Sequence, residues 1–138
     1  MIPPIDVTTL PGPAQKIVDD SAPPKLKLMA AKGVVPGLRP DAILTVLVLL
    51  SKAGEVDVSD QAKSTLAALP EPVLKGALDA DLVPAVIMVL AKNYSGRIDV
   101  LEHVLRMPQL PIEAVEHLAQ HGDERTVELV ATNEERML

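Results

Sequence analysis

Apolar residues recur along this chain at the three-residue and four-residue spacing that is typical of amphipathic α-helices. The pattern is clearest near the C-terminus, in two stretches that are joined by Gly122 and Asp123. The first stretch carries an apolar stripe made of Ile112, Val115, Leu118 and Ala119. The second carries a shorter stripe made of Val127, Val130 and Ala131, with Leu129 beside it. Residues 109–138 are therefore predicted to form a helical hairpin whose apolar side must pack against another element.

Residues that start and stop helices mark the ends of these two stretches. Pro111 suits the first position of a helix, and His121 falls in the last turn of the same helix. Gly122 is expected to stop this helix in the left-handed conformation, and Asp123 is expected to cap the next one. Residues 132–133 are expected to end or bend the second helix.

The same spacing predicts further helices upstream, in residues 25–32, 41–53, 57–69, 73–78, 84–93 and 98–107. Residues 41–53 are apolar nearly all round, which predicts the central helix of the N-terminal half. Asp57 is expected to cap the following helix, with Asp60 three residues later in an arrangement like a capping box. A basic patch on a solvated helix face is expected from Lys25, Lys27, Lys32 and Arg39.

Two of these segments repeat one pattern. Residues 83–107 can be aligned with residues 110–133, and Pro84 then corresponds to Pro111, about 27 residues later. Tandem helical pairs with proline at the helix starts predict an all-α fold, in the form of a short HEAT-like α-solenoid of helical hairpins. An irregular helical bundle is the alternative, because the same periodicity permits it. Signals for β-strands are missing, since the chain has one Tyr, no Phe and no Trp.

Proline is concentrated at the N-terminus. Six of the 13 prolines of the chain fall within the first 24 residues, at Pro3, Pro4, Pro11, Pro13, Pro23 and Pro24. We expect residues 1–24 to form a Pro-rich arm or linker, extended and ordered only where it lies along the helices. Residues 25–138 are expected to form the helical-repeat domain, and a short helix within residues 14–20 is the alternative for part of the arm.

Composition narrows the chemistry that is open to the chain. The absence of Cys excludes a disulfide framework, thiolate metal ligands and a thiol nucleophile. The net charge of -6 argues against binding to nucleic acid or to an anionic membrane, which requires a basic surface. The N-terminus lacks the pattern of a signal peptide, and no apolar run approaches the roughly 20 residues that span a bilayer. A cytoplasmic location is therefore expected.

Acidic residues are concentrated in the C-terminal part of the chain. From residue 54 onward there are 15 acidic and seven basic residues, against four and six before it. The simpler interpretation is a solvated outer face. The functional interpretation is a negative surface for a basic protein partner, with Asp123, Glu124 and Glu128 as candidate contacts.

Three segments carry a resemblance to a known family. They are residues 24–31 (PKLKLMAA), residues 66–74 (LAALPEPVL) and residues 122–133, which contain GDER and ELVATN. On these segments the run from Pro24 to Leu138 resembles an uncharacterised HEAT-like helical domain of large proteins from deltaproteobacteria and their relatives. The resemblance implies helical pairs that continue beyond Leu138 in a longer protein, and it implies no catalytic residues.

The sharpest candidate for chemistry lies on the first helix of the C-terminal hairpin. Glu113, His117 and His121 follow one another at four-residue spacing, so they share a helix face and could offer Zn²⁺ a carboxylate and two imidazoles. On a helical wheel this face lies opposite the apolar stripe, and an ordinary surface pair of Glu113 with His117 is the expected result. No metal site, cofactor or catalytic residue is predicted, and no catalytic nucleophile or phosphate-binding loop is found.

These features predict a non-catalytic protein–protein interaction or scaffolding module of a larger bacterial protein or complex. A regulatory domain that binds a small ligand in a groove between helices is the alternative. Exposed apolar helix faces would also allow the chain to form homo-oligomers.

Overall fold

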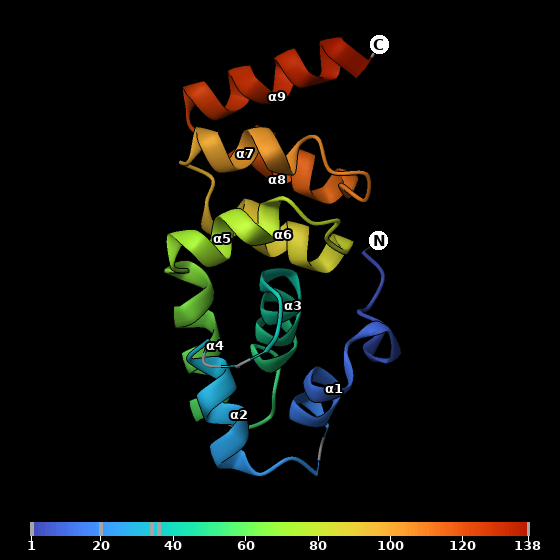
Figure 1. Ribbon diagram of the computed structural model, residues 1–138. Coiled ribbons are helices and arrows are strands. Elements are labelled where there is room, and N and C mark those ends of the chain that lie inside the picture. The colour runs from blue at the N-terminus through green and yellow to red at the C-terminus, as the bar shows by residue number, and fades with distance from the viewer. Residues whose placement is uncertain (1, 20, 34, 36, 138) are drawn as a thin grey trace. The chain divides into compact units, whose positions relative to one another are not determined.

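The computed structural model describes residues 2–19, 21–33, 35 and 37–137, with side chains as far as residue 132. Within these residues the chain forms nine α-helices, one 3-10 helix and no β-strand, which confirms the predicted all-α fold (Figure 1). The chain divides into two compact units, Pro4–Ala80 and Asp81–Leu138, the second of which includes Met1–Pro3. The boundary predicted from the sequence lies between residues 24 and 25.

Prolines begin several of the helices in both units. The first unit contains η1 (Val7–Thr9), α1 (Gly12–Val18), α2 (Pro24–Ala31), α3 (Pro40–Leu50), α4 (Val56–Ala67) and α5 (Glu71–Leu78). The second contains α6 (Pro84–Asn93), α7 (Ile98–Val104), α8 (Ile112–His121) and α9 (Glu124–Met137). Pro24, Pro40 and Pro84 are each the first residue of a helix, where the missing N–H of proline has no intrahelical acceptor to lose.

Helix α3 is the centre of the first unit, as predicted from its apolar sequence. It packs against α1, α2, α4 and α5. Its buried residues are Ala42, Ile43, Leu44, Val46, Leu47, Val48 and Leu50. Burial of one Val, Leu or Ile side chain stabilises a fold by about 1.5–3 kcal/mol, so α3 supplies much of the driving force for this unit. None of the described helices, α3 included, is both long enough and apolar enough to cross a membrane.

The N-terminal stretch differs from the extended arm that its prolines led us to expect. It contains η1 and α1, and α1 packs against α3 and α2. Leu10, Ala14 and Ile17 are buried. Their spacing of four and three residues forms a small apolar stripe, and its burial on α3 outweighs the tendency of the nearby prolines to keep the chain extended.

Helix α4 begins without the predicted side-chain cap. Its N-cap residue is Glu55, whose side chain makes no capping hydrogen bond. Asp57 lies inside the first turn, so the predicted capping role of Asp57 is wrong. A carboxylate in that turn still interacts favourably with the positive end of the helix dipole.

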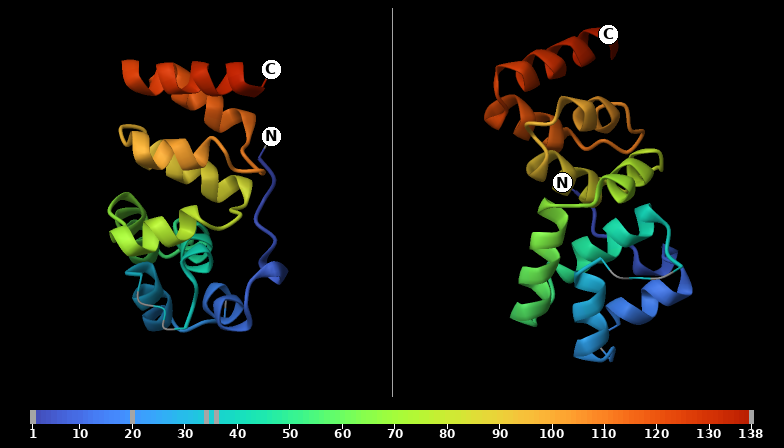
Figure 2. Two further views of the ribbon diagram at one scale, coloured as in Figure 1. Left: turned by 45° about the horizontal axis from the view of Figure 1, so that its top comes forward. Right: turned by 60° about the vertical axis from the view of Figure 1, so that its left-hand side comes forward.

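The second unit consists of two helical pairs. Helix α6 packs against α7 and α8, while α9 packs against α7 and α8 (Figures 1 and 2). The first helices of the two pairs are thus in contact, and so are the second helices. The buried core that joins them is made of Ala91, Leu101, Leu105, Ala114, Leu118 and Val130.

The predicted hairpin of α8 and α9 forms, but it buries only part of each predicted apolar stripe. On α8, Leu118 is buried, whereas Ile112 is 62% exposed and Ala119 is also exposed. On α9, Thr126 is fully buried with Val130, whereas Val127 and Ala131 are exposed. A polar residue can replace an apolar one in the α9 stripe because the Thr126 hydroxyl donates a hydrogen bond of 2.7 Å to the Ser95 carbonyl.

The turn between α8 and α9 was predicted in its position and in its cap. Asp123 Oδ1 accepts a hydrogen bond of 2.9 Å from the Thr126 N–H, so Asp123 caps α9 as expected. Gly122 has a φ of -74°, and the left-handed stop expected there is wrong. Glycine is required for space, because a Cβ would lie 2.5 Å from the Leu118 carbonyl oxygen and 2.5 Å from Thr126 Cγ2. The expected end at residues 132–133 is also wrong, since α9 continues to Met137.

Candidate functional site

The two histidines of α8 lie side by side, as their spacing predicts. The ring centroids of His117 and His121 are 4.8 Å apart, and the rings are tilted by 41°. His121 is exposed, but His117 is half-buried, so the expectation of a solvent-facing side chain is only partly correct for His117. Partial burial, together with the charges of His121 and Lys92, lowers the pKa of His117.

The metal candidates do not assemble into a three-ligand site. Among the described residues, no group of three or more His, Cys, Asp or Glu side chains could hold a metal ion. The structure therefore brings His117 and His121 together without placing Glu113 as a third ligand beside them. Two imidazoles on one helix are fewer than the three or four protein ligands of ordinary zinc sites.

The three acidic candidates lie at the start of α9 and are all exposed. Asp123 is engaged by α9 itself, because the Thr126 N–H donates to its carboxylate and lowers the pKa of Asp123. Glu124 and Glu128 lie one helical turn apart. They leave the carboxylates of the first two turns of α9 open to solvent.

The exposed face of α9 combines charge with apolar surface. Glu124, Val127, Glu128 and Ala131 occupy positions that share one side of the helix, and all four are exposed. Val127 is 40% exposed, which is high for a large apolar side chain on a helix whose opposite face is buried. We call these four residues the outer face of α9.

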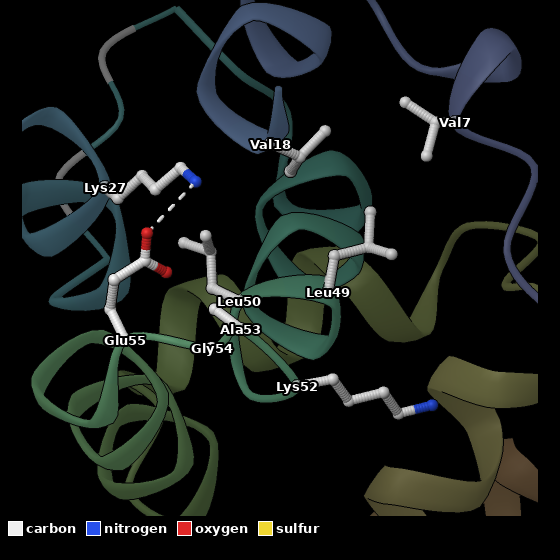
Figure 3. A pocket seen from close by; sticks show the side chains of 9 residues that line it. All are labelled: Val7, Val18, Lys27, Leu49, Leu50, Lys52, Ala53, Gly54 and Glu55. Carbon is white, nitrogen blue, oxygen red and sulfur yellow. Dashed lines mark ion pairs between the residues drawn. The ribbon is translucent and has the colours of Figure 1, made fainter. Parts of the chain in front are cut away.

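A cavity of about 600 Å³ lies in the first unit (Figure 3). It is partly open to solvent, and its lining residues come from η1, the end of α1, the first turn of α2, the end of α3 and the loop before α4. Its lining consists of Val7, Val18, Lys27, Leu49, Leu50, Lys52, Ala53, Gly54 and Glu55. Its volume falls in the range of about 300–1,000 Å³ that is typical of sites for small ligands.

Lys27 brings a charge to this cavity from a position where the sequence analysis expected a solvated side chain. The side chain of Lys27 is only 6% exposed, so its expected place in a surface basic patch is wrong. Lys27 Nζ lies 3.6 Å from Glu55 Oε1, and the two side chains point toward one another (Figure 3). Meanwhile, Leu26 and Met29 on the same helix are 39% and 46% exposed.

The buried position of Lys27 follows from the small residues on its helix. Ala30 and Ala31, three and four residues after Lys27, are buried against neighbouring helices. Small side chains let α2 approach its neighbours closely, and the long stem of Lys27 fills part of the same face. A sequence signal was present, therefore, in the two alanines one turn after Lys27.

Comparison of the chain with protein-family models, with curated protein sequences and with solved structures gave no match.

Proposed function

We propose that this chain is a non-catalytic protein-interaction or scaffolding module of a larger bacterial protein or complex. We further propose that its helical pairs belong to a HEAT-like stack, since equivalent helices of the two pairs in the second unit are in contact. The sequence features described above favour a cytoplasmic setting for this module.

The observation that carries the proposal is the outer face of α9. Buried Thr126 and Val130 anchor α9 to its own unit, so the helix presents Val127 and Ala131 to solvent on a firmly packed element. Exposed apolar groups surrounded by polar ones are typical of protein–protein contacts. The neighbouring carboxylates of Glu124 and Glu128 favour a partner with a positively charged surface.

The partner that fits this face is a basic amphipathic segment. Lysine or arginine side chains of such a segment would pair with Glu124 and Glu128, and its apolar side would cover Val127. Charges at the rim of an interface mainly increase the association rate and the specificity, and they are screened by salt. Binding should therefore weaken as the ionic strength rises.

Affinity capture with a matched pair of variants tests this proposal. The E124Q/E128Q double variant removes the charges of the outer face, while E102Q/E116Q removes two exposed charges elsewhere in the same unit. We expect a partner that is retained by the wild type and by E102Q/E116Q, is released by salt and is lost from E124Q/E128Q. Equal retention by both double variants would refute the outer face of α9 as the binding surface.

A second copy of the chain is the alternative occupant of an exposed apolar face. Light scattering of the purified protein over a range of concentrations distinguishes the two cases. A dimer that Val127→Glu dissociates would replace the basic partner with a homo-oligomeric contact. A strictly monomeric wild type leaves the face free for another protein.

The cavity of the first unit favours a second candidate function. A regulatory domain that binds a small ligand between helices requires a ligand-sized space with a few polar groups, and the cavity beside Lys27 and Glu55 offers both.

A further inference from the structure

The aliphatic residues that line the cavity favour a ligand that has an apolar part. Val7, Val18, Leu49, Leu50 and Ala53 supply the apolar part of its lining, beside the charged residues Lys27, Lys52 and Glu55, and they come from η1, α1, α3 and the following loop. Aliphatic walls of this kind gain free energy when an aliphatic chain displaces water from them.

One end of the cavity carries the ion pair of Lys27 and Glu55. The Lys27 ammonium group carries three N–H donors, and the carboxylate oxygen Glu55 Oε1 is 3.6 Å from Lys27 Nζ. Charge-assisted N–H···O hydrogen bonds are shorter, at about 2.7–2.9 Å. The pair is therefore a loose ion pair, and the ammonium group can still donate to an oxygen atom that enters the cavity.

Exposure decides which member of the ion pair a ligand would replace. The side chain of Glu55 is 46% exposed, whereas that of Lys27 is 6% exposed. Glu55 can turn into water at little expense, but Lys27 is held among buried residues and would be left without a counter-charge. An entering ligand must therefore carry the same sign of charge as Glu55.

The other charges near the cavity do not reverse this preference. The hydrogen bonds from Ser21 and, to a smaller extent, the charge of Lys27 lower the pKa of Asp19. Asp19 Oδ1 already accepts hydrogen bonds of 2.9 Å from the N–H and the hydroxyl of Ser21. Lys52 adds a second positive charge to the lining, and its ammonium group points away from Lys27 in Figure 3.

We propose that this cavity binds a small aliphatic carboxylate. The ligand carboxylate lies on Lys27 Nζ in the place of Glu55, and its hydrocarbon chain lies against Val18, Leu49 and Leu50. This inference rests on the second candidate function, ligand binding between helices, and it is independent of the interaction surface on α9.

Three probes of equal chain length but different end groups distinguish the contribution of charge to binding from the contribution of the apolar chain. Octanoate, octanol and octylamine are titrated into the 138-residue chain, and binding is followed through the NMR signals of the valine and leucine methyl groups. We expect octanoate to shift the signals of Val7, Val18, Leu49 and Leu50 and to bind about tenfold more tightly than octanol, as a hydrogen bond to a charged group allows. Octylamine should bind more weakly than octanol.

Two variants, K27M and E55Q, should change the affinity for octanoate in opposite directions, and a third variant is the control. K27M keeps the length of the side chain but removes its charge, so octanoate should lose its advantage over octanol. E55Q removes the competitor for Lys27, so octanoate should bind several-fold more tightly than to the wild type. K25M changes an exposed lysine on the same helix and should leave all three affinities unchanged.

The outcomes distinguish two claims: that the cavity binds a ligand, and that this ligand is a carboxylate. Equal binding of octanoate and octanol at the cavity, or tighter binding of octylamine, would overturn the carboxylate assignment and leave a ligand site there. If no probe shifts the cavity methyl signals of wild type or of E55Q, both the assignment and the second candidate function fail. If E55Q weakens octanoate binding, Glu55 does not compete for Lys27 and the assignment is wrong.

Discussion

The hydroxyl group of Thr126 on α9 donates a hydrogen bond of 2.7 Å to the backbone carbonyl of Ser95, in the loop between α6 and α7. This bond ties the second helical pair of its unit to the first, across 31 positions of sequence. It also explains how a threonine can be fully buried in a face that otherwise packs through Leu129 and Val130.

Thr126→Val should therefore destabilise the protein although valine has nearly the same shape. The substitution leaves the Ser95 carbonyl without this donor, and we expect a loss of about 1–3 kcal/mol in the free energy of unfolding. Urea denaturation measures the change. Thr132→Val makes the same substitution on the exposed side of α9 and should have an effect within about 0.5 kcal/mol. Equal effects of the two variants would show that the hydrogen bond contributes little.

Gly122→Ala should be destabilising for reasons of space. A Cβ at this position would lie 2.5 Å from the Leu118 carbonyl oxygen and 2.5 Å from Thr126 Cγ2, so α8 or α9 must shift. We expect a loss of about 1–3 kcal/mol, as found for overpacked sites. Gly54→Ala is the matched control, because a Cβ there meets no atom within 4 Å. If both variants had the wild-type melting temperature, the turn would be looser than the structure shows.

The cap of α9 should make stability depend on pH. The Thr126 N–H donates to Asp123 and lowers its pKa below the unfolded value, so the ionised carboxylate stabilises the fold above the unfolded pKa of about 3.9. This contribution is lost as the pH falls through the lower pKa of the folded state. Asp123→Asn keeps a capping oxygen but does not titrate.

Thermal unfolding of wild type and Asp123→Asn between about pH 7 and pH 2 measures this effect. Relative to the variant, the wild type should lose stability only below about pH 4. A difference in melting temperature that stays constant over the whole range would show that the Asp123 carboxylate does not contribute through its ionised form.

Two residues of the apolar stripe predicted for α8 should respond differently to truncation. Leu118 is fully buried in the core of its unit, so Leu118→Ala should reduce the free energy of unfolding by about 2–5 kcal/mol. Ile112 is 62% exposed, so Ile112→Ala should change it by about 0.5 kcal/mol or less. A large loss for Ile112→Ala in a monomeric protein would mean that the predicted stripe was correct and that this face is covered.

Local signals in the sequence were sufficient to place most of the helices. Proline at helix starts, glycine between helices and apolar residues at helical spacing predicted α2 to α9 to within a few residues. The cap at Asp123 was also predictable, because it joins residues that are three positions apart. The start of α4 was not, since the acceptor role of Asp57 depends on where the preceding loop enters the helix.

Less of the candidate functional site could be predicted from local signals in the sequence. The pairing of His117 with His121 follows from helix geometry, and their separation of 4.8 Å agrees with it. The cavity beside Lys27 could not be predicted, because its lining comes from segments between residues 7 and 55 that only the fold brings together. Lys27 was expected to lie on a solvated helix face with Lys25, Lys32 and Arg39.

The sequence alone determined the helical character of this protein, the positions of its turns and its acidic C-terminal half. These properties depend on backbone preferences and on neighbours within one helical turn. The tertiary structure decided which side of each helix is buried, as with Lys27 inside and Met29 outside on α2. That choice depends on side chains far away in the sequence, such as Glu55 for Lys27 and the Ser95 carbonyl for Thr126, because a buried polar group is tolerated only where the fold supplies its partner.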